Sequence, residues 1–131
     1  MTASALAQYI GSTVPGLSWS LGEGGNVFEE QTPPEPDIIV GVYSVGGGEV
    51  LTHEPFREPN VQLIVRGNED PQSALNLWHL LYNYLHGLRL VQLPDNVWLV
   101  SCVVVQSAPI RIGPDENGRY RFSMNLRMET R

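Results

Sequence analysis

Apolar residues recur at helical spacing in two stretches of the chain. Residues 2–10 place apolar side chains at the i, i+3, i+4 and i+7 positions of one helical face, and Gly11 offers an end. In the second stretch Asp70 is a good N-cap, and Pro71 suits the first helical position, where a missing N–H costs nothing. An apolar stripe with spacings of three and four then continues to Gly87. The sequence therefore predicts a short N-terminal helix and a longer second helix.

Other stretches carry strand patterns. Residues 38–44 are apolar and rich in β-branched residues, which is typical of a strand buried on both faces, and residues 97–105 are predicted to form a central strand. Residues 60–67 and 120–128 alternate apolar and polar positions, which indicates strands with one face toward water. Residues 26–29 suit a further short strand.

The end of the chain predicts a long hairpin. Residues 110–113 continue strand 97–105 after Pro109. The Asn117-Gly118 pair predicts a type I′ turn, which needs two positive φ angles.

Prolines between residues 31 and 37 exclude a helix or a central strand there, so this segment is predicted to be an extended connector. The element order is a helix, two or three strands, a helix and a long hairpin. We expect one domain over residues 1–131 with an α+β fold. Its sheet would be mixed and mainly antiparallel, with a long helix packed on one face and a short N-terminal helix.

Charge divides the chain into two regions. The net charge is −6, and all eight basic residues are arginines. Residues 1–70 hold ten acidic residues against two arginines, whereas residues 71–131 hold four against six. Ordinary nucleic-acid binding is disfavoured, because an acidic chain repels phosphates. Two differently charged regions suit head-to-tail association, although the same charges could pair within one chain.

Compartment and chemistry are constrained by what the sequence lacks. A single cysteine excludes an intramolecular disulfide, and the longest apolar run is too short for a membrane span. The N-terminus does not have the pattern of a signal peptide, so we expect synthesis in a reducing cytoplasm. The absence of lysine excludes a Walker loop and a Schiff base.

No catalytic, cofactor-binding or metal-binding residues are predicted. His79 and His86 share the second helix without a third ligand at a compatible spacing, and His53 is the remaining histidine. No serine lies in a Gly-x-Ser-x-Gly elbow. Cys102 lies among valines, as a structural residue would. The sequence thus favours a non-enzymatic protein that assembles with others.

The ordered set of motifs resembles the small minor capsid and tail-terminator proteins of long-tailed bacteriophages. The resemblance covers nearly the whole chain. Its pieces are residues 6–10 with 15–17, the strand 26–28, the Pro-Glu-Pro-Asp of 34–37 before an apolar strand, residues 61–67, the helix 70–87, Pro109 and the Asp-Glu-Asn-Gly-Arg of 115–119.

The resemblance implies a virion protein whose copies form a ring, commonly of six, at the head-proximal end of the tail tube. Such a ring stops tube polymerisation and provides the docking surface for the head. One face would match the tail tube protein and the other the head–neck connector protein, with DNA only passing through an acidic bore. No catalytic residues or cofactors follow from the resemblance, and no membrane partner is expected.

Two sets of residues are the candidate contacts of that ring. The first set lies in two loops and is Gly46, Gly47, Gly48, Glu49, Asp115, Glu116, Asn117, Gly118 and Arg119. The second set is Arg66, Arg121 and Arg127, as donors to ion pairs between subunits. Two other functions stay open: a head-completion or stopper protein of the neck, and a small enzyme or ligand-binding domain with Trp98 and Tyr43 lining a pocket.

Overall fold

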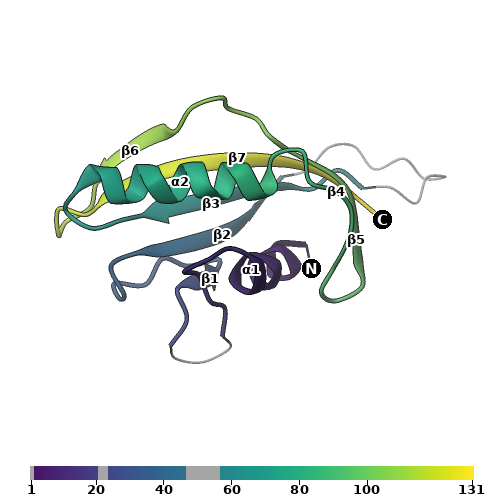
Figure 1. Cartoon of the computed structure of the whole chain (residues 1–131), viewed down its shortest axis with the longest axis horizontal. Coiled ribbons are helices and arrows are strands. Elements are labelled where there is room, and N and C mark those ends of the chain that lie inside the picture. The colour runs from purple at the N-terminus through teal and green to yellow at the C-terminus, as the bar shows by residue number, and fades with distance from the viewer. Residues whose placement is uncertain (1, 21–23, 47–56) are drawn as a thin grey trace.

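The structure is a computed structural model that describes residues 2–20, 24–46 and 57–131 (Figure 1). In this part of the chain, the elements in order are α1 (Thr2–Thr13), β1 (Val27–Glu29), β2 (Ile39–Val45), β3 (Asn60–Arg66), α2 (Pro71–Leu85), β4 (Arg89–Leu93), β5 (Val97–Val104), β6 (Ile110–Pro114) and β7 (Tyr120–Thr130). The strands form one sheet of order β1-β2-β3-β7-β5-β4, and β6 also pairs with β7. The β1–β2 pair is parallel, and the other described pairs are antiparallel.

The predicted α+β fold with a long helix packed on one sheet face is wrong. The structure is mostly sheet, with 41% strand and 23% helix, and the sheet curls into a half-barrel. Its helices are short, with 12 residues in α1 and 15 in α2. The apolar stripe of 70–87 correctly indicates a buried helix face, but periodicity carries no information about the curvature of the sheet that buries it.

The curl of the sheet follows from its contacts with α1. This helix contacts β1 and β2 at one end of the strand order and also β4 at the other. Both ends can reach one helix only if the sheet bends around it. Register shifts occur between Leu99 and Ser101 in β5 and between Arg111 and Gly113 in β6, and such irregularities increase local bend and twist. The buried residues of both helices belong to one hydrophobic core with those of the strands.

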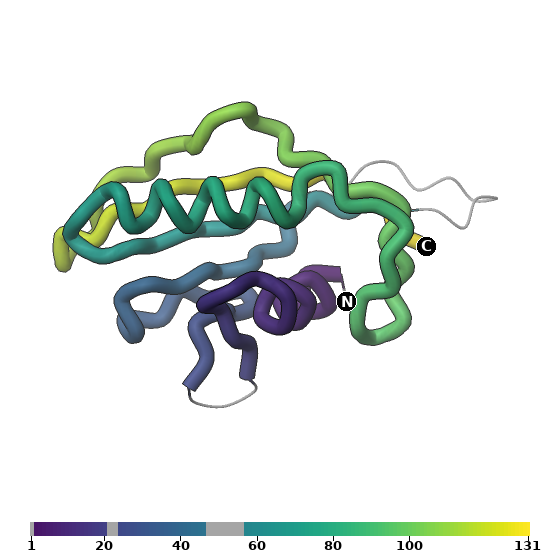
Figure 2. Tube along the Cα trace, viewed as in Figure 1, coloured from purple at the N-terminus to yellow at the C-terminus, as the bar shows by residue number. Residues whose placement is uncertain are grey.

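β7 is the central strand of this arrangement. It pairs with β3 on one side and with both β5 and β6 on the other. The predicted strands 60–67, 97–105 and 120–128 are confirmed, and so is the continuation of β5 by β6. Figure 2 shows the chain bowing away from the sheet between these two strands. Alternate residues of β3 and β7 point into the core: Val61, Leu63, Val65, Phe122, Met124 and Leu126.

The signals for the second helix are confirmed at its N-terminus. The Asp70 side chain accepts a hydrogen bond from the Gln72 backbone N–H at 3.0 Å, and Pro71 is the first helical residue. Inside the helix Trp78 is fully buried, and its indole N–H donates to the Ser123 backbone oxygen of β7 at 2.9 Å. This bond fixes α2 against the central strand.

Local details differ from prediction at three places. Gly11 lies inside α1, where an added Cβ would meet the Trp19 backbone nitrogen at 2.4 Å, so this glycine permits close approach and does not end the helix. β4 was not predicted. Its apolar Leu90 is 57% exposed and has a φ of 54°, so apolar residues in this strand do not mark a buried face. The turn before β7 is not type I′, because Gly118 has a positive φ of 77° and Asn117 does not.

Candidate functional site

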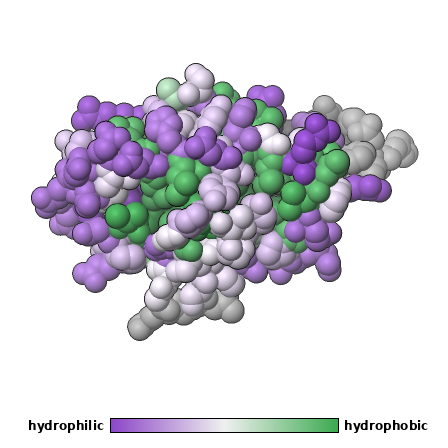
Figure 3. All heavy atoms as spheres, in the orientation of Figure 1, coloured by the Kyte–Doolittle hydropathy of each residue, from purple (hydrophilic) through white to green (hydrophobic). Residues whose placement is uncertain are grey.

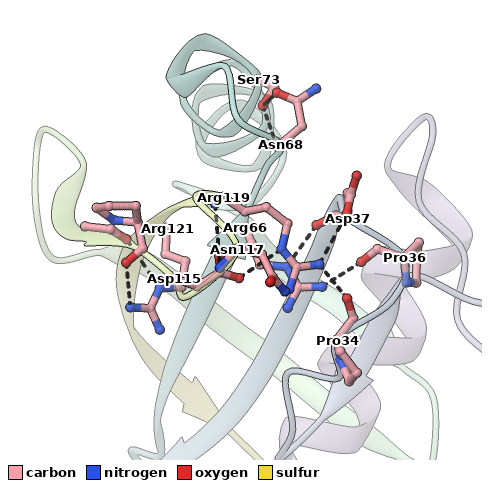
Figure 4. A network of polar contacts seen from close by, with 12 residues as sticks. Pro34, Pro36, Asp37, Arg66, Asn68, Ser73, Asp115, Asn117, Arg119 and Arg121 are labelled. Atoms are coloured by element: carbon pink, nitrogen blue, oxygen red, sulfur yellow. Dashed lines mark hydrogen bonds and ion pairs between the residues drawn. The ribbon is translucent and has the colours of Figure 1, made fainter.

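Two buried arginines hold the connector, residues 31–37, at one end of the sheet (Figure 4). Arg66, the last residue of β3, is 4% exposed and lies opposite Arg121 of β7. Its Nε donates to the Asp37 backbone oxygen at 3.0 Å, and its Nη2 donates to the Pro36 oxygen at 2.6 Å. Burial, and then the neighbouring Arg119, lower the pKa of Arg66. A guanidinium nevertheless stays charged in proteins, so its donors satisfy the connector carbonyls.

Arg119 binds the same connector from the turn that precedes β7. Its Nε donates to Asp115 Oδ2 at 2.9 Å, and its Nη1 donates both to Asp37 Oδ1 at 3.2 Å and to the Pro34 backbone oxygen. Asp115 Oδ1 also accepts the backbone N–H groups of Asn117 and Arg119, each at 2.9 Å. Burial raises the pKa of Asp115, but these backbone bonds and the Arg119 guanidinium outweigh it and hold the pKa below its usual range.

The connector crosses the outer face of the sheet at Gly41. A Cβ added to Gly41 would lie 2.9 Å from both the Gln31 backbone oxygen and Thr32 Cγ2. Only a residue without a side chain lets the connector pass this close to β2. Gly41 and the bonds from Arg66 and Arg119 together therefore fix the path of residues 31–37.

An acidic cleft opens beside this network, where α2 begins. Its volume is about 480 Å³, and its lining residues are Pro34, Glu35, Asp37, Asn68, Glu69, Asp70, Asn117 and Arg119. The four carboxylates lie on exposed residues, whereas Arg119 is 6% exposed. Hydrophilic residues gather at this end of the molecule, at the left of Figure 3. The surface presented here is therefore negative although arginines support it from below.

A family model for the bacteriophage tail terminator protein matches residues 15–131. The chain belongs to this tail terminator family. The match spans far more than half of the chain and includes the connector, the arginine network and every strand. A comparison with curated proteins gave no match. Membership makes the chain a structural component of the phage tail.

Six of the predicted contact residues lie together around the arginine network of Arg66 and Arg119. Arg66, Asp115, Glu116, Arg119 and Arg121 line a second cleft of about 350 Å³, and Asn117 lies in the acidic cleft. Arg66 and Arg119 are engaged within the chain, as the alternative of internal pairing allowed. Their predicted role between subunits stays a prediction.

The other predicted contact residues lie elsewhere. Gly118 is exposed at the turn, Arg127 is exposed on β7, and Gly46 is exposed just after β2. Gly47, Gly48 and Glu49 lie outside the described residues. Sequence reasoning missed Glu35 and Glu69 as neighbours in one cleft. Their acidic character was visible in the charge count, but residues this far apart in sequence meet only because α2 starts beside the connector.

The structure shows the surroundings of several residue types that often carry chemistry. Within residues 2–20, 24–46 and 57–131, no group of three His, Cys, Asp or Glu side chains could hold a metal ion. Burial raises the pKa of the Cys102 thiol to about 12, which leaves it protonated and unreactive at neutral pH. His86 Nδ1 accepts the Val104 backbone N–H at 3.1 Å, which is a structural bond. His53 lies outside the described residues.

Two further findings bear on the alternatives. Tyr43 and Trp98 are absent from the lining of the two clefts described above and of two others in the described part of the chain. Neither described helix has the length and apolar character needed to cross a lipid bilayer.

Proposed function

We propose that copies of this chain form a ring, of about six subunits, at the head-proximal end of a phage tail. The ring ends polymerisation of the tail tube and provides the surface on which the head docks. The observation that carries this proposal is the match to the tail terminator family over residues 15–131. Its partners are further copies of itself, the tail tube protein and the head–neck connector protein.

The mechanism is geometric and needs no bond chemistry. A ring that matches the last layer of the tube on one face, and differs from it on the other, leaves no surface for another layer of tube protein. Shape and charge complementarity provide such selectivity, because like charges brought together at a contact cost several kcal/mol. The arginine network suits this role, since it holds the connector, residues 31–37, against the sheet.

The charge of the chain supports passive transit of DNA through the ring. The net charge is −6, so a bore lined by such subunits would repel phosphates more than it binds them. A structural role is supported by the tail terminator family to which the chain belongs.

The first test is the assembly state of the purified protein with and without tail tubes. Light scattering across concentrations should give a mass near six chains, or negative-stain images should show a single ring at one end of each tube. A protein that stays monomeric and leaves tubes uncapped would contradict the proposal. A protein that binds isolated heads and ignores tubes would instead favour a stopper of the neck.

A further inference from the structure

An apolar flank is exposed on the side of β7 that faces away from β3. It consists of four residues from a single stretch of the chain, each more than a third exposed: Val103 at 42%, Val105 at 49%, Ile110 at 38% and Ile112 at 42%. We call these four residues the apolar flank. Half of the exposed large apolar residues in the described part of the chain thus lie between residues 103 and 112, at the end of β5, just after it and in β6.

The register of β7 places most of this flank on the outer face of the sheet. Val103 lies opposite Arg127, Ile110 lies opposite Ser123, and the Val105 N–H donates to the Asn125 oxygen at 2.9 Å. The flanking β7 residues Phe122, Met124 and Leu126 point into the core. Val103, Val105 and Ile110 therefore form a row on the outer surface of one monomer, where contiguous apolar area indicates a binding surface.

The outer face of the flank carries a positive charge at Arg127. Residues 97–114 contain no acidic residue, and exposed Arg127 lies opposite Val103. Arg111 lies opposite the core-facing Phe122, with its guanidinium 5.9 Å from the centre of the Tyr120 ring, so it belongs to the other face of the sheet. The acidic cleft has the opposite character. It carries Glu35, Asp37, Glu69 and Asp70, and Pro34 on its lining and the neighbouring Ile38, which is 39% exposed, add apolar surface.

We propose that the apolar flank of one copy docks against the acidic cleft of a second copy, with Arg127 facing Glu35 and Glu69. The inference rests on the proposed ring and names its contact. Each surface combines apolar side chains with charge, and the charges of the two surfaces are opposite, so a second copy supplies what each lacks. Because two different surfaces meet, the contact is head-to-tail, and repetition of such a contact closes a ring when its rotation allows.

The test is a charge exchange between two variants. The flank variant carries Arg127→Glu, and the cleft variant carries Glu35→Arg and Glu69→Arg. All three positions are exposed, so folding should survive, which circular dichroism checks. Each variant alone should lose self-association by about 100-fold or more, because like charges meet at the contact. In an equimolar mixture each contact again joins opposite charges, so sedimentation should show rings of alternating variants.

Matched controls and opposite results make the test decisive. Arg57→Glu and Asp95→Arg change the same charges at exposed positions away from both surfaces, since Arg57 lies opposite the buried Thr130 and Asp95 lies in the turn between β4 and β5; both should leave assembly unchanged. Variants that assemble like the wild type, or that stay apart in the mixture, would overturn this contact while wild-type rings keep the proposed function. A wild type that is monomeric both alone and with tail tubes would overturn the contact and the ring together.

A second measurement uses introduced cysteines. The single native cysteine is buried, so it should not form disulfides with them. Ile110→Cys and Glu35→Cys proteins, mixed and mildly oxidised, should give a disulfide-linked dimer containing one copy of each. Dimers of either protein with itself, in equal yield to the mixed dimer, would contradict the head-to-tail contact.

Discussion

Replacing Arg66 with methionine tests whether the buried arginines hold the connector. The change keeps an unbranched side chain in the same space and removes two charge-assisted hydrogen bonds, to the Pro36 and Asp37 oxygens. Such bonds contribute about 1.5–3 kcal/mol each when their acceptors are buried. Pro36 and Asp37 are exposed residues, so water can replace part of that interaction and about 1 kcal/mol per bond is the better expectation.

Two terms act in the opposite direction. Methionine avoids the burial of a charge, and it removes the repulsion between Arg66 and Arg119 that lowers the pKa of Arg66. We still expect a net loss of about 2 kcal/mol, since the guanidinium is satisfied by the connector carbonyls. For a domain of this size that loss corresponds to a fall in Tm of roughly 6–10 °C.

Urea unfolding followed by tryptophan fluorescence measures the free energy of unfolding, and amide hydrogen exchange measures opening of residues 31–39. Arg127→Met is the matched control, because Arg127 is exposed, and it should shift stability by less than about 0.5 kcal/mol. Equal stability of the two variants with unchanged exchange in the connector would refute the reasoning. A more stable Arg66→Met protein would show that the burial penalty of the charge exceeds its bonds.

Three further changes test other parts of the account. Gly41→Ala should cost about 1–3 kcal/mol in thermal unfolding, because the new Cβ would lie 2.9 Å from connector atoms, whereas Gly46→Ala meets nothing within 4 Å and should be near neutral; equal effects would contradict the close approach. The pKa of Asp115 is lower in the folded state, so its contribution to the free energy of unfolding is present above the unfolded pKa and is lost as pH falls through the folded pKa. Asp115→Asn should therefore weaken the loss of stability in acid, and an unchanged profile of stability against pH would contradict this. Trp78→Phe should cost roughly 2–4 kcal/mol in urea, because it leaves a small cavity and an unpaired Ser123 oxygen; a loss below 1 kcal/mol would show that the bond is dispensable.

The sequence predicts the local elements of this protein well where local chemistry decides them. The cap at Asp70, the proline at the first helical position and the alternation in β3 and β7 each act within a few residues, and each is confirmed. Prediction fails where distant residues decide. Gly11 is required by Trp19 and not by a helix end, and the curl of the sheet depends on α1 reaching β4.

The site shows the same division. Arg119 was predicted as a contact residue of the ring, but its side chain is buried because the connector folds over it. The motifs that resemble phage tail terminators identify the family correctly. The acidic cleft could not be predicted, since Glu35 and Glu69 become neighbours only through the sheet topology. The apolar flank was equally hidden, because a β-branched strand looks the same in sequence whether its outer face is covered or exposed.

The central claim is that this protein ends growth of a tail tube, and tube growth in its presence tests that most directly. Purified tail tube protein would be polymerised with increasing amounts of this protein, and tube lengths would be measured by electron microscopy. The account predicts that growth stops early, that mean length falls as the amount rises, and that a single ring caps one end of each tube. Tubes of unchanged length with bare ends at every ratio would contradict it.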